Sequence, residues 1–256
     1  ASLLDEGTAD MSSRELAEAR ERLGAGISVN ASLDRTTATL SALEPNLGAS
    51  LDLMADILKN PAFASSEIER LRAQQITGIA SEMTQPVGIA LRTLPPLLYG
   101  DDHPYGTPFT GSGNPEAVAA LTREDIVTAH QRWIRPDNAQ IFVVGDTTLA
   151  AITPLLEARF GAWAAPTAPK GTKAFDGNVP QPTPRIVLID KPQSPQSLIF
   201  AGTVLPMEGT DELTTLLAAN EVLGGNFLSR INMDLRETKG WSYGVRGSVQ
   251  INENAV

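Results

Sequence analysis

Residues 226–245, NFLSRINMDLRETKGWSYGV, carry the side chains whose types and spacing are best suited to chemistry. Arg236 and Tyr243 stand seven residues apart, on either side of the glycine at which an amphipathic helix is expected to pass into a strand. A guanidinium and a phenol are both hydrogen-bond donors. Alternatively, Arg236 pairs with a surface carboxylate while Tyr243 packs in the sheet, and the residues alone leave both interpretations open.

Few other residues offer catalytic potential. Cysteine is absent, which excludes disulfides and thiolate metal sites. His103 follows Asp101 and Asp102 in the loop YGDDHPYGTP; a metal site there is one hypothesis, and a solvated acidic turn is the simpler one. His130, in the expected helix TREDIVTAHQRWI, is interpreted as a surface or partly buried polar residue. The sequence contains no HxxEH, HExxH, G-x-S-x-G, P-loop or Rossmann motif, so it shows no catalytic machinery of its own.

Bulk properties limit the class of protein. The 256 residues suffice for one large or two ordinary domains, and 42% of them are hydrophobic, enough for a core. A net charge of −10 argues against nucleic acid or an anionic membrane as the main partner, and no run of 18 apolar residues predicts a membrane span. Because the sequence starts with alanine and stops in strand-like SVQINENAV, we expect residues to be missing at both ends, where a signal peptide would be invisible.

The elements that must position these residues follow from periodicity and from start and stop signals. Capping boxes at Ser12–Glu15 and Ser66–Glu69 predict two helix starts. The expected helices are 12–23, 45–60, 65–83, 86–98, 115–120, 122–133, 148–161, 210–223 and 226–238, and the expected strands are 27–33, 37–43, 139–146, 185–190, 196–205 and one starting at Ser242.

Composition and self-similarity divide the chain. Five prolines between 161 and 184 indicate a linker between a first domain, 1–160, and the start of a second, 185–256. RERLGAGISVNAS (20–32) and RETKGWSYGVRGS (236–248) share five identities at a helix–glycine–strand junction, which predicts a duplication. Since hairpins are followed by runs of helices, we predict an α+β fold. It would have two related layered domains, each a largely antiparallel sheet with helices on one face, the first lacking its opening strands and the second truncated.

The order of these pieces resembles the pitrilysin/insulinase-type zinc peptidases, the inverzincins, which include mitochondrial processing peptidase. The resemblance covers nearly the whole chain outside the linker and is carried by LLDEGT at 3–8, residues 12–63, HPYGTP at 103–108, residues 121–146 and residues 221–245. In active members, HxxEH supplies two zinc-binding histidines and the general-base glutamate, and a downstream glutamate is the third ligand. Here Ala1 and Ser2 stand at the closing Glu-His positions, Ser81 stands at the downstream position with Glu82 beside it, and the first histidine would precede residue 1.

The resemblance therefore implies degenerate metal-ligand positions at Ser2 and Ser81 and no metal bound by this chain. It also gives a role to Arg236 and Tyr243, because an L-R-E…G-x-x-Y segment in the second half of family members reaches across a cavity to the zinc of the catalytic half. There the pair would hydrogen-bond the substrate carbonyl as it becomes an oxyanion.

The leading hypothesis is a non-catalytic subunit of a zinc metalloendopeptidase that lends Arg236 and Tyr243 to a zinc-bearing HxxEH partner in a heterodimer. A homo-oligomer is the other possible assembly. The alternatives are a structural or peptide-holding protein of the same fold, and an active enzyme with a metal site built from His103 and the nearby aspartates. Paired bacterial proteins of this type often carry export signals, so we expect a periplasmic location, with the cytoplasm as the alternative.

Overall fold

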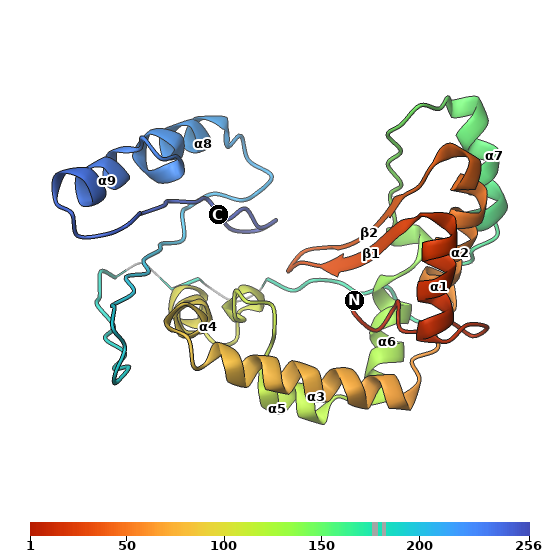
Figure 1. Cartoon of the computed structure of the whole chain (residues 1–256), viewed down its shortest axis with the longest axis horizontal. Helices are drawn as coiled ribbons and strands as arrows, with labels where there is room; N and C mark the ends of the chain where they lie inside the picture. The colour runs from red at the N-terminus through yellow and green to blue at the C-terminus, as the bar shows by residue number, and fades with distance from the viewer. Residues whose placement is uncertain (176–178, 181–182) are drawn as a thin grey trace.

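The computed structural model describes residues 1–175, 179–180 and 183–256. Figure 1 shows a lobe built on a β-hairpin and helices α1, α2 and α7, a run of helices α3 to α6, and a second lobe with α8 and α9. The elements in chain order are α1 (Ser13–Leu23), β1 (Gly26–Ala31), β2 (Thr36–Ser41), η1 (Glu44–Asn46), α2 (Leu47–Lys59), α3 (Ser65–Glu82), α4 (Pro86–Tyr99), η2 (Pro104–Gly106), α5 (Pro115–Ala120), α6 (Arg123–Trp133), η3 (Pro136–Asn138), α7 (Leu149–Phe160), α8 (Thr214–Asn220), η4 (Glu221–Gly225), α9 (Arg230–Asn232) and η5 (Met233–Thr238).

Helix α1 shows how local sequence signals set the first lobe. The predicted capping box is confirmed: the Ser12 side chain accepts from the Glu15 backbone, and the Glu15 carboxylate accepts from the Ser12 backbone N–H at 2.9 Å. The helix ends at Gly24, which adopts the left-handed conformation with φ 59° that glycine accommodates without strain. Between these ends, Leu16 is fully buried. The helix therefore starts, stops and faces the core as its residues dictate.

The hairpin and two helices enclose the main hydrophobic core. β1 and β2 pair antiparallel from Gly26↔Ser41 to Ala31↔Thr36, so both strands expected here are confirmed. Ile27 and Val29 point to the same face and are buried. The core cluster comprises Leu4, Leu16, Ala19, Ile27, Val29, Leu53, Ile57, Phe63 and Ile68.

Arginine side chains join the helices of the first lobe and the middle run. Arg72 of α3 donates to the carbonyl oxygen of Leu121, at 2.6 Å, just beyond the end of α5. Arg159 of α7 forms a two-pronged ion pair with Asp52 of α2, with N–O distances of 2.8 and 3.0 Å. Bidentate arginine–carboxylate pairs fix orientation as well as distance. These contacts hold α5 against α3 and α7 against α2.

Several predicted strands are wrong for the described residues. The backbone at 139–146, 185–190, 196–205 and from Ser242 on is extended but forms no ladder with a neighbour. A strand is defined by pairing, and a single extended segment leaves both its backbone edges and both its side-chain faces uncovered. Val144 is 99% exposed and Ile186 is 97% exposed.

The predicted fold class is confirmed only in part. Among the described residues there is one sheet, the two-stranded antiparallel β1–β2, in a helix-rich chain. The helices and the antiparallel pairing of the predicted α+β fold are observed. The second predicted sheet, in the region 185–256, is not.

Two predicted helices of the second lobe have a different form. The expected helix at 210–223 is a short α8 followed by the π-helical turn η4. The expected helix at 226–238 is a single turn, α9, followed by the π-helical η5. The capping box at Ser66 and Glu69 is also wrong, because α3 begins at Ser65 with Ala64 as its N-cap.

The predicted linker, 161–184, packs on the end of α6 where the structure describes it. Residues 176–178 and 181–182 of it lie outside the described residues. The buried Arg135 donates to the Ala168 carbonyl at 2.8 Å, and the Gly171 N–H donates to the Arg132 carbonyl at 3.0 Å. The domain boundaries at 160 and 185 stay predictions.

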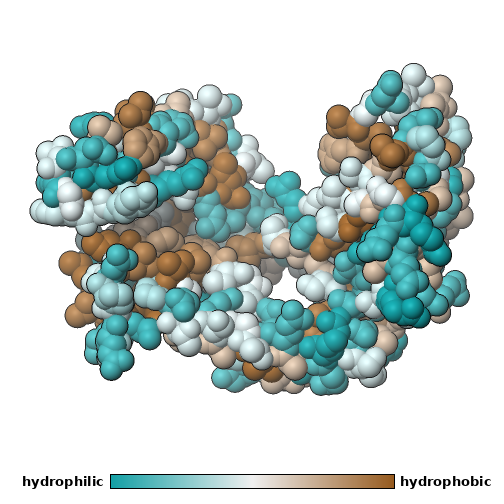
Figure 2. Space-filling model, viewed as in Figure 1, coloured by the Kyte–Doolittle hydropathy of each residue, from teal (hydrophilic) through white to brown (hydrophobic). Residues whose placement is uncertain are grey.

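The tip of the hairpin contacts the C-terminal segment at a cluster centred on Asp34. Its carboxylate accepts from the Tyr105 hydroxyl at 2.8 Å, from Lys173 at 3.0 Å and from the Glu253 backbone N–H at 2.9 Å. Figure 2 shows an open notch between the two lobes, and Figure 1 shows the hairpin pointing from the first lobe toward the C-terminal segment. We call this cluster, Asp34 with Tyr105, Lys173 and Glu253, the clasp.

No described helix combines the length and apolar character that a membrane span requires.

Candidate functional site

The predicted pair lies in the second lobe on a frame of two π-helical turns. η4 and η5 flank the turn that begins at Asn226. Asn226 fixes this turn: its side-chain amide donates to the Glu221 carbonyl at 2.8 Å and accepts from the Leu228 N–H at 2.9 Å. π turns are rare and are frequent at functional sites. One extra residue in a turn rotates the residues after it by about 100°, so η5 directs its side chains differently from a continuous α-helix.

Arg236 contacts two aromatic rings. Its guanidinium carbon is 4.5 Å from the centroid of the Phe227 ring and 5.3 Å from that of Tyr243. Both distances are within the range of cation–π attraction, so both rings stabilise the position of the cation. The structure thus brings together the two residues selected from the sequence and adds Phe227.

The alternative interpretation of Arg236 is observed in part. Its Nε lies 3.3 Å from the carboxylate of the neighbouring Glu237. Both side chains are partly solvated, so this pair contributes little stability. Tyr243, by contrast, does not pack in a sheet: it is 93% exposed. The guanidinium is oriented and the phenol is accessible.

Asn232 links the two segments that supply the rings. Its amide nitrogen donates to the Phe227 carbonyl at 2.7 Å, and its amide oxygen accepts from the Val245 N–H at 2.9 Å. The side chain is buried. Sequence reasoning missed both Phe227 and Asn232. A signal for Asn232 existed, because asparagine inside a helical stretch favours hydrogen bonds to backbone over helix formation.

A second cation lies near the site on the same segment. Lys239 is 4.9 Å from the Trp241 ring centroid and forms an ion pair with Asp234 at 2.8 Å. Gly240 between these residues is left-handed, with φ 63°. The region is therefore rich in exposed aromatic rings and donors. Such a surface can hydrogen-bond carbonyl or carboxylate oxygens and contact apolar groups beside them.

The degenerate metal-ligand positions hold no ligand set. Ser2 and Ser81 are both exposed, and Figure 1 shows the N-terminus well separated from the α3–α4 junction near which Ser81 lies. Glu82 is occupied otherwise: its carboxylate accepts from Arg92 at 2.9 Å and from the Ser112 hydroxyl at 2.8 Å. Burial alone raises the pKa of Glu82, but these hydrogen bonds and the Arg92 charge lower it overall. The residues present therefore do not fit a zinc ion.

The hypothesis of a metal site at His103 is not supported. His103 is buried in an aromatic cluster, and its Nδ1 accepts from the Tyr105 N–H at 3.0 Å to cap η2. Burial lowers the pKa of this imidazole, which favours the neutral ring. Asp101 and Asp102 are exposed, and the described part of the chain holds no group of three or more His, Cys, Asp or Glu residues suited to a metal ion.

His130 is a partly buried polar residue, as predicted. Its Nε2 lies 2.8 Å from the Leu58 carbonyl, and its ring packs edge-on to Phe63 with centroids 5.6 Å apart. Burial lowers the pKa of His130 more than the hydrogen bond to Leu58 raises it.

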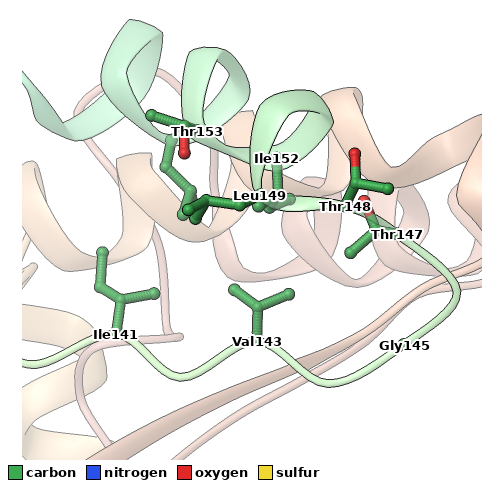
Figure 3. A pocket seen from close by; sticks show the side chains of 9 residues that line it. Ile141, Val143, Gly145, Thr147, Thr148, Leu149, Ile152 and Thr153 are labelled. Atoms are coloured by element: carbon green, nitrogen blue, oxygen red, sulfur yellow. The ribbon is translucent and has the colours of Figure 1, made fainter.

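A cavity of about 340 Å³ with a mixed lining of aliphatic side chains and threonines lies in the first lobe, away from Arg236. Figure 3 shows Ile141 and Val143 of the extended segment pointing toward α7, with Leu149 and Ile152 on the opposite side. The lining offers hydroxyls from threonines but no titratable group. This cavity is the gap between an unpaired strand-like segment and a helix, and it brings no chemistry to the site.

Comparison with known proteins places this geometry in context. Residues 120–255 match the sequence model of the "Peptidase M16 inactive domain", and residues 2–94 match that of "Insulinase (Peptidase family M16)". An uncharacterized zinc protease of Mycobacterium tuberculosis is 26% identical over 254 residues, covering 97% of this chain and 56% of that protein. One of Bacillus subtilis is 26% identical over 239 residues, covering 93% of this chain and 56% of that protein.

Solved structures show the same fold. A peptidase M16 inactive domain from Pseudomonas fluorescens superimposes with a TM-score of 0.79 at 22% identity, covering 99% of this chain and 61% of that one. A protease from Helicobacter pylori gives 0.76 at 19% identity, with the same coverage of 99% and 61%. The chain spans little more than half the length of the curated relatives that it matches.

Proposed function

We propose, from the premise that the chain belongs to the insulinase family of peptidases (family M16), that it is a non-catalytic subunit of a zinc metalloendopeptidase. In this function it lends Arg236 and Tyr243 to a partner that carries HxxEH and the zinc ion. The peptide substrate would lie in a cavity shared by the two chains.

The observation that carries the proposal is the contact of Arg236 with the rings of Phe227 and of an exposed Tyr243. Two rings restrict the guanidinium, so part of the entropy cost of ordering it is met before a ligand binds. Its remaining N–H donors and the Tyr243 hydroxyl would then be available to one oxygen atom.

The two side chains have separate tasks in this proposal. Arg236 donates a charge-assisted hydrogen bond to the carbonyl oxygen of the scissile peptide bond as negative charge develops there. Tyr243 donates a neutral hydrogen bond and limits where that oxygen can lie. The partner supplies the metal-activated water, because the first half of this chain has Ala1, Ser2 and Ser81 where active members have ligands and base.

The test is reconstitution of peptide cleavage. A candidate partner with HxxEH, sought first in the neighbouring coding sequence, is mixed with the wild-type chain and with Arg236→Ala, Arg236→Lys or Tyr243→Phe. We expect Arg236→Ala to lower kcat/KM by about 10²–10³-fold, the range for loss of one oxyanion donor. Arg236→Lys keeps the charge but loses the planar guanidinium group, so its kcat/KM should lie between those of wild type and Arg236→Ala. Tyr243→Phe should lower it by roughly tenfold, as for a neutral hydrogen bond.

Arg230→Ala is the matched control, since Arg230 is an exposed arginine on the same segment. It should leave kcat/KM within about twofold of wild type, because surface substitutions of this kind change free energies by tenths of a kcal/mol. Unchanged cleavage with Arg236→Ala and Tyr243→Phe would show that the assigned roles are wrong.

A peptide-holding protein of the same fold is the second candidate. It is favoured by the exposed apolar extended segments, because unpaired strand edges accept extended peptide by main-chain hydrogen bonding. This function predicts peptide binding by the chain alone and no stimulation of any partner. Titrating a fluorescent unstructured peptide with the chain, with and without the partner, distinguishes the two.

A further inference from the structure

We infer that Asn232 is the positioning residue of the Arg236–Tyr243 pair: its side chain joins the segments that carry Phe227 and Tyr243, whose rings contact the guanidinium. This role rests on the proposed function of the pair, but the geometry on which it depends is a property of this chain alone.

Burial and pairing set Asn232 apart from its neighbours on the segment. It is 3% exposed in a region where Phe227, Trp241 and Tyr243 are largely exposed. A buried amide costs free energy unless its donor and acceptor are both paired. Here both ends are used: the nitrogen reaches back five residues to Phe227, and the oxygen reaches forward thirteen residues to Val245.

These two hydrogen bonds join the backbone close to each ring. The Phe227 carbonyl belongs to the residue whose ring lies under Arg236, and the Val245 N–H is two residues beyond Tyr243. The segment after Gly240 is also held at Trp241, whose N–H donates to the Leu235 carbonyl at 2.9 Å, and at Gly247, whose N–H donates to the Gly224 carbonyl at 2.8 Å. Between these two anchors, the Asn232–Val245 hydrogen bond holds the stretch that carries Tyr243, so its loss should loosen the Tyr243 ring against the guanidinium.

The chemistry requires asparagine at this position. An ionised carboxylate of the same shape can still accept from the Val245 N–H, but it would set an oxygen against the Phe227 carbonyl oxygen at the place of the 2.7 Å hydrogen bond. Leucine fills the volume and makes neither bond. A protonated carboxyl group has a donor and an acceptor again, so acidification should restore the link in Asn232→Asp.

The first experiment follows the Arg236 side-chain Nε–H signal by NMR in the purified chain. In wild type, ring currents from Phe227 and Tyr243 should shift this proton upfield, and the shift should be constant from pH 8 to pH 5. In Asn232→Asp and Asn232→Leu the shift should fall by at least half at pH 8. In Asn232→Asp alone it should return as pH falls through the pKa of the new carboxyl group, which burial raises.

Asn46→Asp is the matched control, because the Asn46 amide also donates to a backbone carbonyl, that of Leu23 at 2.8 Å, but in the first lobe. It should leave the Arg236 signal unchanged. An unchanged Arg236 signal in folded Asn232→Leu and Asn232→Asp overturns the positioning role. If both variants unfold, Asn232→Ser, whose hydroxyl is too short to make both bonds, decides in the same way.

The second experiment asks whether positioning matters for cleavage in the reconstituted complex. Asn232→Asp should lower kcat on the order of tenfold at pH 8 with little change in KM, because a misplaced donor affects the transition state most. Tyr243→Phe should have a smaller effect in the Asn232→Asp background than in wild type. If Arg236→Ala leaves cleavage unchanged while the NMR shift responds to Asn232→Asp, the proposed function fails and the positioning geometry stands. If Arg236→Ala lowers cleavage while the NMR shift does not respond to Asn232→Asp, the positioning role of Asn232 fails and the proposed function stands.

Discussion

The segments 20–32 and 236–248 are the two regions whose comparison is most informative. Both carry an arginine four residues before a glycine, and both glycines are left-handed, with φ 59° at Gly24 and 63° at Gly240. The glycine-terminated junction predicted from the repeat is therefore the same in both places. The structure on each side of it is not.

The two arginines show the difference. Arg20 lies on an α-helix and pairs with Asp5 at 3.4 Å beside the main core. Arg236 lies on a π-helical turn and contacts two exposed aromatic rings. After the glycine, one chain enters a paired strand and the other runs as a single extended segment. The same local signal thus ends a helix in both regions, while packing decides whether the arginine serves stability or remains available to a ligand.

The largest expected difference between the regions is in their cores. Leu16→Ala removes a fully buried side chain of the first lobe and should lower the free energy of unfolding by about 3 kcal/mol. Leu228→Ala, at a leucine that is 74% exposed in the second lobe, should cost less than about 0.5 kcal/mol. Urea unfolding of the purified chain measures both. Equal losses would mean that the second lobe has a core of comparable density.

The clasp, where the hairpin tip meets the C-terminal segment, should give the next largest effect. Burial raises the pKa of Asp34, but hydrogen bonds from the Glu253 N–H, the Tyr105 hydroxyl and Lys173 together lower it below its usual value. The Asp34 side chain is 13% exposed, so screening by water is limited. We expect Asp34→Asn to lower the free energy of unfolding by about 2 kcal/mol at pH 7, as for hydrogen bonds to a charged group.

The pH dependence of that loss follows from the lowered pKa. A carboxyl group with a lower pKa in the folded state contributes stability that is fully present above its unfolded pKa of about 3.9. This contribution is lost as pH falls through the folded pKa. The difference between wild type and Asp34→Asn should therefore shrink below about pH 4. Arg35→Ala, at the exposed neighbouring residue, is the control and should show no such trend. A constant difference down to pH 3 would contradict the assigned charge.

The glycines test whether the two junctions are equivalent. Neither Gly24 nor Gly240 has an atom within 4 Å of an added Cβ, so substitution is opposed by backbone conformation and not by crowding. Gly24→Ala and Gly240→Ala should each cost about 1–2 kcal/mol, the penalty of a left-handed alanine. Asparagine at either position should cost less. Calorimetric unfolding of the four variants measures whether the same substitution lowers the free energy of unfolding equally at the two glycines. A much smaller loss for Gly240→Ala than for Gly24→Ala would show that the two junctions are not equivalent.

Short-range signals in the sequence predicted much of the fold. Gly24 and the box at Ser12 fix the ends of α1, and the hairpin around Asp34 has the alternation of a half-buried pair. Pairing of the later strand-like segments could not be predicted in the same way, because alternation such as that around Val144 shows suitability for a sheet and not the presence of a neighbour. The π turns were missed because their extra residue depends on packing, and a hydrophobic period of 3.6 residues carries no information about that packing.

The sequence pointed to the polar residues of the candidate site, whose role stays a prediction, but not to the residues that hold them in place. Arg236 and Tyr243 were found by type and spacing, and the structure brings their side chains together. Phe227 and Asn232 looked like an apolar and a polar residue of one amphipathic helix. Their role appears only when the turn at Asn226 folds Phe227 back toward Arg236. Contacts of this kind depend on how the chain folds back on itself in three dimensions, which a local sequence pattern does not specify.

The smallest expected effect separates the helix starts of the two regions. Ser12 caps α1 with a reciprocal box, and its hydroxyl donates to Glu15 at 2.7 Å, so Ser12→Ala should cost about 1 kcal/mol. Ser229 precedes α9 in the same N-cap position but makes no side-chain cap bond, and its buried hydroxyl has no hydrogen-bond partner among the described residues.

An unpaired buried hydroxyl is a cost that alanine removes. Ser229→Ala should therefore be neutral or stabilising by up to about 1 kcal/mol. Paired urea titrations of the two variants give the sign directly. A loss of 1 kcal/mol or more with Ser229→Ala would mean that this hydroxyl is bonded in solution, and the second helix start would then resemble the first. Opposite signs would show that the helices before the two glycines both end at a left-handed glycine but do not share a serine cap at the start.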